Sequence, residues 1–318
     1  MYNEPIFLQP VFQEKIWGGD KLKTVYHYDI PSEQTGEAWV ISAHPNGPSM
    51  IENGPLKGKT LADAWEFHGE LFNKSNDNHE AYPLLVKMLD AHDDLSVQVH
   101  PDDAFARDVE GVPYGKTECW YILDAEEGSE LVLGHHAQTK QELEQMMADG
   151  AWDKLLRRVK VQPGDFVYVP SGTIHAIGSG IVILETQQSS DTTYRVYDYD
   201  RTDAEGNERE LHLEKAAAVT HVPHQVPELN QEKDVSGGLT TLKCVENEYF
   251  GVSQWSLDGH TEQTMVADFL QVSVIKGTAV LVVSDSRFEI AKGSHFILPH
   301  GIETFEMSGD AEFVVSWV

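Results

Sequence analysis

The stretch Gly164-Asp165-Phe166-Val167-Tyr168-Val169-Pro170-Ser171-Gly172-Thr173-Ile174-His175 decides the fold of this chain, because its spacing of glycine and proline occurs twice. The second copy runs from Gly293 through Pro299 and Gly301 to Thr304. Glycine and proline at such positions set a strand, a tight turn and a second strand that aims the last residue into a barrel. We therefore predict two related β-barrels, of which only the first keeps a metal-binding side chain at the end of this turn.

Most of the remaining sequence also consists of short apolar runs broken by Gly, Pro, Asp and Asn, as in Gly277–Val283. This pattern predicts a mainly β protein, with a small helical element inserted in its N-terminal part. One helix is expected from Thr60 to about Asn73, where Thr60 can act as the N-cap. A second is expected from Thr139 to about Val159, and Gly150 should break it into two.

A polar, proline-rich stretch, His221–Asp234, has the composition of a linker between two β units. It predicts an N-terminal catalytic domain over residues 1–225, with short helical segments. Residues 235–318 would then form a second, degenerate barrel domain without metal ligands.

The chain is strongly acidic, with 23 Lys and Arg against 52 Asp and Glu and a formal net charge of −29. Such a surface repels nucleic acid and anionic membranes, so we expect neither as a partner. An anionic substrate would need local positive charge in its site. The two cysteines, Cys119 and Cys244, suggest no disulfide framework, and no signal peptide or apolar span is evident. We expect a soluble, cytoplasmic protein, monomeric or homodimeric.

Four residues in predicted strands and turns form a ligand set for a divalent metal: Gln98, His100, Glu118 and His175. Gln98 and His100 are two residues apart, so on a strand their side chains share one face. The inner face of a β-barrel is the simplest place for such a site. Residue types alone leave zinc, iron and manganese open.

At this point the sequence resembles a known family, the type I phosphomannose isomerases of the cupin superfamily. The turn ending at His175 looks like the second cupin motif. The other matching segments, in chain order, are Gly36–Ser42, Leu95–Asp103, Lys116–Glu118 and Glu185–Arg195. The chain looks like the short bacterial form, which lacks the large helical insertion of longer members.

This resemblance implies a zinc-dependent interconversion of mannose 6-phosphate and fructose 6-phosphate, with one Zn²⁺ per chain held by the four residues above. It also implies a catalytic role for Arg195. Longer members carry a histidine before the lysine of the Lys-x-Glu element, where this chain has Gly115. A proton-transfer role proposed for that histidine cannot apply here.

Aldose–ketose isomerisation moves a proton between C1 and C2 through an enediol, and a bound dication polarises the carbonyl oxygen. Arg195 can stabilise the enediolate electrostatically, but it does not titrate near neutral pH and is not the base. Three candidates for the base stay open: Glu185, Lys116 and a zinc-bound hydroxide. Lys116 is two residues from Glu118 and should face the same way.

The substrate phosphate needs hydrogen-bond donors and positive charge. Ser96 shares the face of Gln98, and Lys116 and Arg201 are the basic candidates for this role. The competing interpretation of Arg201 is a loop salt bridge with its neighbouring aspartates. The remaining histidines considered are interpreted as surface residues: His92, His135, His136, His295 and His300.

Two other functions remain compatible with a metal-binding barrel. One is an iron-dependent cupin oxygenase, which would use two histidines and a carboxylate without a distant arginine. The other is a non-catalytic sensor that binds a sugar phosphate. Arg195 together with Glu185 argues against a sensor, because a sensor needs no base.

Overall fold

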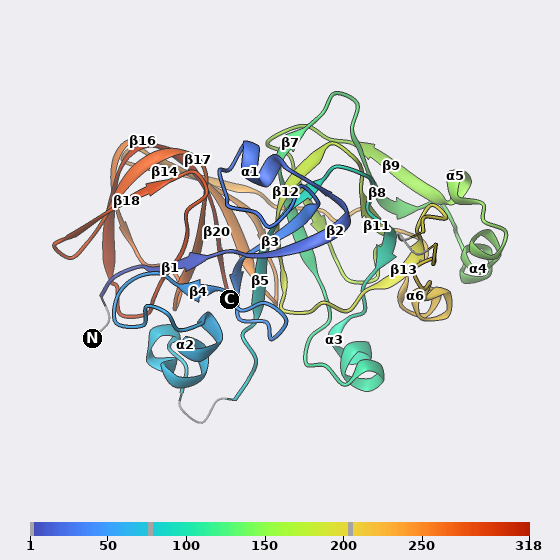
Figure 1. Ribbon diagram of the computed structural model, residues 1–318, viewed down its shortest axis with the longest axis horizontal. Helices are drawn as coiled ribbons and strands as arrows, with labels where there is room; N and C mark the ends of the chain where they lie inside the picture. The colour runs from blue at the N-terminus through green and yellow to red at the C-terminus, as the bar shows by residue number, and fades with distance from the viewer. Residues whose placement is uncertain (1–2, 76–78, 203–205) are drawn as a thin grey trace.

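The computed structural model describes residues 3–75, 79–202 and 206–318, and it consists mainly of antiparallel strands. In Figure 1 an N-terminal β-barrel lies beside a C-terminal one, and helices α4, α5 and α6 lie at the far side of the N-terminal barrel. The predicted fold class, mainly β with two cupin-like barrels, is confirmed. No helix in the described part of the chain is long and apolar enough to cross a membrane.

The N-terminal barrel is built from two sheets. The six-stranded sheet has the order β10 (Phe166–Val169), β7 (Glu118–Ala125), β12 (Ile181–Gln188), β5 (Leu84–Ala91), β3 (Thr35–Ser42) and β2 (Val11–Gly19). The five-stranded sheet has the order β13 (Tyr194–Tyr197), β6 (Val97–Val99), β11 (His175–Ile177), β8 (Glu130–His135) and β9 (Leu156–Lys160).

A nine-stranded sheet forms the C-terminal barrel. Its main path is β14 (Glu232–Ser236), β15 (Leu239–Glu246), β16 (Gly251–Thr264), β20 (Thr304–Trp317), β17 (Leu270–Val283), β19 (His295–Leu298), β1 (Ile6–Gln9) and β4 (Met50–Ile51), and β18 (Ser286–Ala291) pairs with β17. The first strand of the chain therefore belongs to the last sheet, since Ile6 pairs with Ile297. The division of the chain near residues 225–235 stays a prediction, and β1 crosses it.

The helices are short: α1 (Lys21–Thr24), α2 (Leu61–Phe67), α3 (Asp103–Phe105), α4 (Lys140–Ala148), α5 (Trp152–Leu155) and α6 (Leu213–Val219), with a 3₁₀ turn at Gly69–Phe72 and a π-helical turn at Ala106–Glu110. Thr60 caps α2 as predicted, because its hydroxyl accepts from the Asp63 amide at 3.0 Å. The single helix predicted to Asn73 is wrong. The helix stops before Gly69, where a Cβ would meet the Lys74 carbonyl oxygen at 2.8 Å.

Gly150 separates α4 from α5 as predicted, and its φ of +62° suits glycine. The extension of that helix to Val159 is wrong. Residues 156–160 form β9, because pairing with β8 satisfies their backbone groups. The predicted linker His221–Asp234 is free of strands only as far as residue 231, where β14 follows.

Strand alternation divides the six-stranded sheet into a polar inner face and an apolar outer face. On β7, Glu118 and Trp120 face the barrel interior, whereas Cys119 and Tyr121 join the core cluster that packs against the C-terminal sheet. Both cysteines are free and buried. The inner face can thus carry a site while the outer face joins the two barrels.

The internal repeat is present in the backbone. Gly164 and Gly172 have φ of +94° and +78°, and Gly293 and Gly301 have +88° and +97°. Both copies therefore make the predicted strand, turn and strand. The last residues differ, because His175 is buried and Thr304 is exposed.

Candidate metal centre and active site

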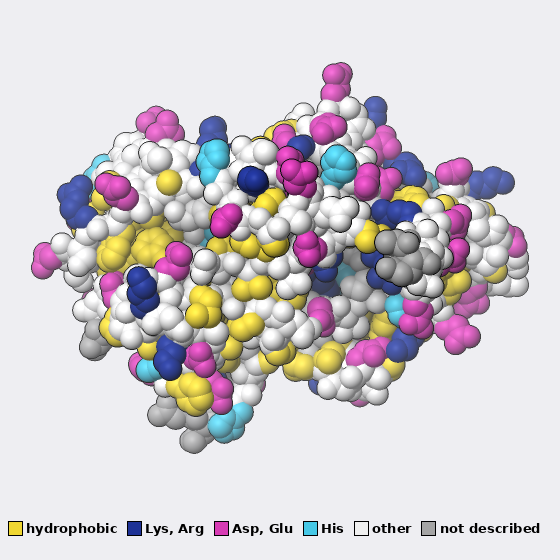
Figure 2. Space-filling view, viewed as in Figure 1, with side chains coloured by type: hydrophobic (Ala, Val, Ile, Leu, Met, Phe, Trp, Pro, Cys, Tyr) yellow, Lys and Arg dark blue, Asp and Glu magenta, His cyan; other side chains and the backbone are white. Residues whose placement is uncertain are grey.

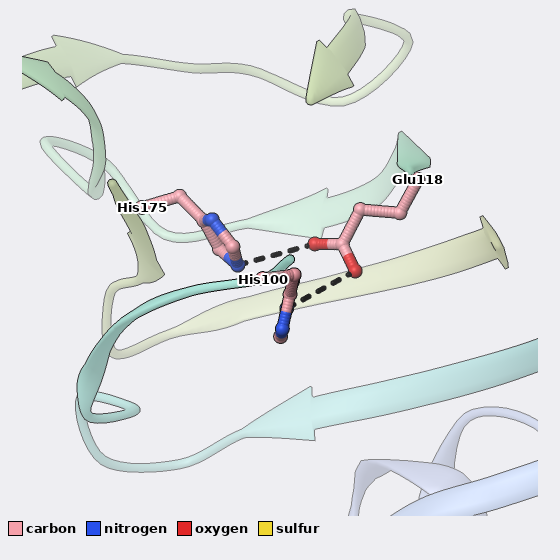
Figure 3. A group of neighbouring side chains, drawn as sticks. All are labelled: His100, Glu118 and His175. Carbon is pink, nitrogen blue, oxygen red and sulfur yellow. Dashed lines mark ion pairs between the residues drawn. The ribbon is translucent and has the colours of Figure 1, made fainter. Parts of the chain in front are cut away.

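Two histidines and a glutamate meet inside the N-terminal barrel (Figure 3). The Nε2 of His100 lies 3.6 Å from Glu118 Oε2, and the Nε2 of His175 lies 3.3 Å from Glu118 Oε1. The carboxamide of Gln98 joins them, 3.3 Å from His175 Nε2. Within residues 3–75, 79–202 and 206–318, these three ionisable groups are the only set of His, Cys, Asp and Glu close enough to hold a metal.

Backbone carbonyl groups fix the orientation of both imidazole rings. The Nδ1 of His100 donates to the Thr192 carbonyl at 2.9 Å, and the Nδ1 of His175 donates to the Thr173 carbonyl at 2.8 Å. A carbonyl oxygen only accepts, so in both rings the proton sits on Nδ1 and the lone pair on Nε2. Metal-binding histidines use this arrangement.

The chemistry of these donors fits a divalent cation. Glu118 is fully buried, its Oε1 has no hydrogen-bond partner, and burial raises the pKa of its carboxyl to about 8. Burial disfavours the charged form of this group, and a metal ion at the unpartnered Oε1 would stabilise the carboxylate. Two imidazole nitrogens, a carboxylate and a carboxamide form a mixed nitrogen and oxygen set of the kind zinc accepts.

Lys116 shares the face of Glu118, as predicted. Its Nζ contacts Glu118 Oε2, donates to His100 Nε2 at 3.1 Å and lies 3.7 Å from Glu185 Oε1. Lys116, two residues before the start of β7, and Glu185, in the middle of β12, therefore lie next to Glu118.

Glu185, in the middle of β12, is buried among cationic and hydrogen-bond-donating groups. Trp120 Nε1 donates to its Oε1 at 3.1 Å, and Lys87 Nζ lies 3.4 Å from its Oε2. Burial alone would raise the pKa of Glu185, but the charges of Lys116 and Lys87 outweigh it and lower this pKa to about 2.

Sequence reasoning missed a second buried group next to Glu185. Lys87 is only 6% exposed, lies 4.0 Å from Glu37 Oε2 and sits over the Trp39 ring at 5.3 Å. Trp39 Nε1 donates to Glu37 at 2.7 Å. The sequence did contain one indication that Lys87 is buried, because this lysine stands in the middle of the otherwise apolar run Leu84–Leu89.

A cavity of about 360 Å³ opens between the two sheets of the N-terminal barrel. Its walls carry Gln13, Lys15, Trp17, Glu37, Trp39, Asn46, Lys87, Leu89, Leu95, Ser96, Gln98, Lys116, Ile177, Glu185, Asp191, Thr193, Arg195 and Arg209. Figure 2 shows a hollow on the right half of the molecule with Lys and Arg side chains inside it. The cavity thus supplies the local positive charge that the acidic surface lacks.

Arg195 lies next to the ligand set across the five-stranded sheet. Gln98 pairs with Arg195 on one side and with His175 on the other. The Nη1 of Arg195 donates to the Glu210 carbonyl at 2.8 Å, and its Nε is buried without a partner. Within the described residues it is the one cavity-lining cation without a carboxylate in ion-pair range.

The structure does not bring Arg201 to the cavity. Its guanidinium pairs with the Asp198 carboxylate at 2.6 Å and donates to the Asp94 carbonyl at 2.5 Å. The salt-bridge interpretation of Arg201 is therefore the correct one. Arg209, held by the same Asp198 at 2.6 Å, lines the cavity instead. Ser96 also lines the cavity, as expected.

Two of the five histidines assigned to the surface are buried. His135 is 4% exposed, because it closes β8 and its ring turns inward, and His295 is 2% exposed between Ser273 and Tyr28. The other three are exposed as predicted: His92, His136 and His300.

Comparison with known proteins agrees with this geometry. A family model described as the catalytic domain of type I phosphomannose isomerase matches residues 6–145, and the mannose-6-phosphate isomerase cupin domain matches residues 240–318. The mannose-6-phosphate isomerase ManA of Bacillus subtilis is 50% identical over 99% of both chains. The mannose-6-phosphate isomerase of Streptococcus mutans is 48% identical over 98% of both chains.

Solved structures give the same result. The crystal structure of the mannose 6-phosphate isomerase from Bacillus subtilis matches with a TM-score of 0.96 and 49% identity over 99% of both chains. A putative mannosephosphate isomerase from Archaeoglobus fulgidus, at 20% identity and a TM-score of 0.77, shares the fold. The chain belongs to the type I phosphomannose isomerase family.

Proposed function

We propose that this chain is a zinc-dependent aldose–ketose isomerase that interconverts mannose 6-phosphate and fructose 6-phosphate through an enediol. One observation carries the proposal: a buried set of metal ligands lies beside a cavity that also holds an ionised Glu185 and an unpaired Arg195. Family membership supports the same reaction. Each buried charge carries a desolvation cost that other charges or hydrogen bonds must offset. A protein that only binds a sugar phosphate does not need so many of them.

Gln98, His100, Glu118 and His175 would hold the zinc ion. When bound, the zinc acts as a Lewis acid toward the sugar carbonyl oxygen. The imidazole rings, with Nδ1 donating to carbonyl groups, offer their Nε2 lone pairs without rotating. Gln98 is neutral, so Glu118 is the only ligand of the set that offsets the metal's charge.

Glu185 is proposed to move the proton between C1 and C2, with Lys116 beside it. Their side chains lie 3.7 Å apart at the metal site, and the low pKa of Glu185 keeps it ionised and ready to accept a proton. The same low pKa makes Glu185 a weak base. Lys116 offsets this weakness, because its ammonium stabilises negative charge at the reacting atoms.

Arg195 is proposed to stabilise the enediolate, and Ser96, Lys116 and Arg209 to bind the phosphate. Arg195 is one strand away from Gln98, so its charge is close to the metal. Arg209 presents a guanidinium that Asp198 orients, and an arginine can bind a phosphate through paired hydrogen bonds.

The reaction can be followed directly by NMR of mannose 6-phosphate with the zinc-loaded protein in D₂O. We expect fructose 6-phosphate to form, and any deuterium at C2 of the sugar would report the route of the proton. Failure of the zinc-loaded protein to form fructose 6-phosphate would overturn the isomerase proposal. Iron content with oxygen uptake would instead support the oxygenase. The cytoplasmic location and the monomeric or dimeric state stay predictions.

A further inference from the structure

The turn that carries His175 is covered from behind by the segment between the two barrels. Residues 221–224, which we call the clasp, run outside any strand and lie against this turn. The clasp also borders a cavity of about 630 Å³.

A chain of backbone hydrogen bonds joins the clasp to both metal-bearing segments. The amide of His221 donates to the Gly172 carbonyl at 2.9 Å, and the amide of Gly172 donates to the His100 carbonyl at 2.8 Å. Gly172 belongs to the turn that ends at His175. The position of the clasp thus bears on the distance between the two histidine ligands.

His135 holds the clasp from the other side. Its Nε2 lies 2.9 Å from the His221 carbonyl, which can only accept, so the proton of this ring is on Nε2. His135 is buried, and its Nδ1 has no hydrogen-bond partner. The ring therefore has one hydrogen bond, and that bond goes to the clasp.

The clasp packs closely against two glycines. A Cβ at Gly172 would come within 2.9 Å of the His221 ring, and a Cβ at Gly134 would overlap the His224 ring. Gly134 in turn donates to the Ile174 carbonyl at 2.7 Å, next to His175. The equivalent glycine of the second turn, Gly301, has no atom within 4 Å of such a Cβ, so that turn is uncovered.

We infer that His135 is a positioning residue for the metal centre: through the clasp it fixes the Gly172 backbone and hence the spacing of His100 and His175. This inference rests on the proposed zinc site. It gives a function to a buried histidine that touches neither the ligands nor the cavity.

The test compares three substitutions in the full-length chain, with zinc affinity measured by competition against a chromogenic chelator. His135→Phe keeps the ring and removes the donor, so we expect the zinc Kd to rise by about tenfold, the lower end for residues that support ligands. His135→Gln restores an N–H donor and should bind zinc nearly as well as the unmodified protein. The matched control is His136→Phe at the exposed neighbouring position, which should leave the Kd unchanged.

Thermal unfolding without zinc separates positioning from general stability. If His135→Phe lowers the melting temperature of the metal-free protein but leaves the zinc Kd unchanged, the inference is wrong and the proposed site stands. If the unmodified protein binds no zinc, the proposed site fails and this inference with it. Should His135→Phe not fold, His135→Leu takes its place under the same criteria.

Discussion

The two copies of the glycine and proline turn have the same backbone but opposite surroundings. The first ends in buried His175 among charged groups, whereas the second ends in exposed Thr304. The interior of the C-terminal barrel is filled by apolar side chains, among them Trp255, Leu257, Leu270, Val272, Leu281, Phe296, Phe305 and Phe313. Glycine and proline spacing thus specifies the turn, and a separate set of side chains specifies what the barrel does.

Two polar side chains on the outside of the C-terminal barrel contact the N-terminal part of the chain. Gln254 Nε2 donates to the Tyr121 hydroxyl at 2.8 Å, and His295 Nε2 is 2.7 Å from the Tyr28 hydroxyl. Tyr121 is on β7, the strand that begins with Glu118. The second barrel therefore supports the back of the sheet whose front carries the site.

The largest expected effect distinguishes the two turns directly. His175→Ala should remove zinc binding and lower kcat/KM by about a thousandfold or more, because a Lewis acid supplies several kcal/mol. Thr304→His should add no zinc, since that position faces solvent. Metal content and steady-state kinetics measure both, and a second equivalent of zinc in Thr304→His would contradict the comparison.

The next effect separates two arginines of the same region. Arg195→Ala should lower kcat by about 10²- to 10³-fold, as expected for a lost electrostatic stabiliser of the transition state. Arg201→Ala serves as the matched control and should change kcat by only a few fold. The guanidinium of Arg201 forms an ion pair with Asp198 and a hydrogen bond to the Asp94 carbonyl. Equal losses of kcat in the two variants, with zinc still bound, would contradict the proposed role of Arg195 in stabilising the transition state.

A smaller effect concerns the contact between the barrels. Burial lowers the pKa of His295 from 6.5 to about 3. Between pH 6.5 and pH 3, His295 is therefore protonated in the unfolded chain and neutral in the folded one. Its contribution to stability is full above pH 6.5 and is lost as the pH falls toward 3. Between pH 7 and pH 5 this loss is about 2 kcal/mol.

Urea unfolding of the unmodified protein and of His295→Gln at both pH values measures this contribution. The variant should lose about 2 kcal/mol less on acidification than the unmodified protein. His300→Gln, at an exposed site, should show the unmodified slope. Identical slopes for all three proteins would mean that His295 is not kept neutral by burial.

The smallest effect tests the hydrogen bond between the barrels. Gln254→Ala should lower the free energy of unfolding by about 1 kcal/mol, because it leaves the Tyr121 hydroxyl without this donor. Gln263→Ala, in the same strand but bonded within it to Thr261, is the control and should cost less. Denaturant unfolding measures the loss of stability in both variants. A larger loss in Gln263→Ala than in Gln254→Ala would contradict the prediction.

The candidate ligand set was suggested in part by local spacing. Gln98 and His100 are two apart, and the turn to His175 is set by glycine and proline, whereas the resemblance to a family indicated the set as a whole. Lys116 followed from Glu118 by the same alternation. The repeat gave the second barrel, and the resemblance to a family gave the reaction.

The rest depended on contacts distant in sequence. Lys87 comes to Glu185 only because β5 pairs with β12, and Arg209 reaches the cavity through a loop whose path the sequence does not specify. His135 was assigned to the surface because nothing local shows that residue 221 returns to cover it. Strand β9 was taken for helix because its partner, β8, lies far upstream.

The pairing of β1 with β19 has a consequence for how the chain is made. During synthesis β1 leaves the ribosome long before its partner at residues 295–298. Such distant pairing is slow to form, and until then the edge of β1 that pairs with β19 has no partner, although its other edge can pair with β4. Pairing of β1 with β19 can therefore be completed only after residues 295–298 have emerged, which makes β1 a place for misassembly in a product truncated before them.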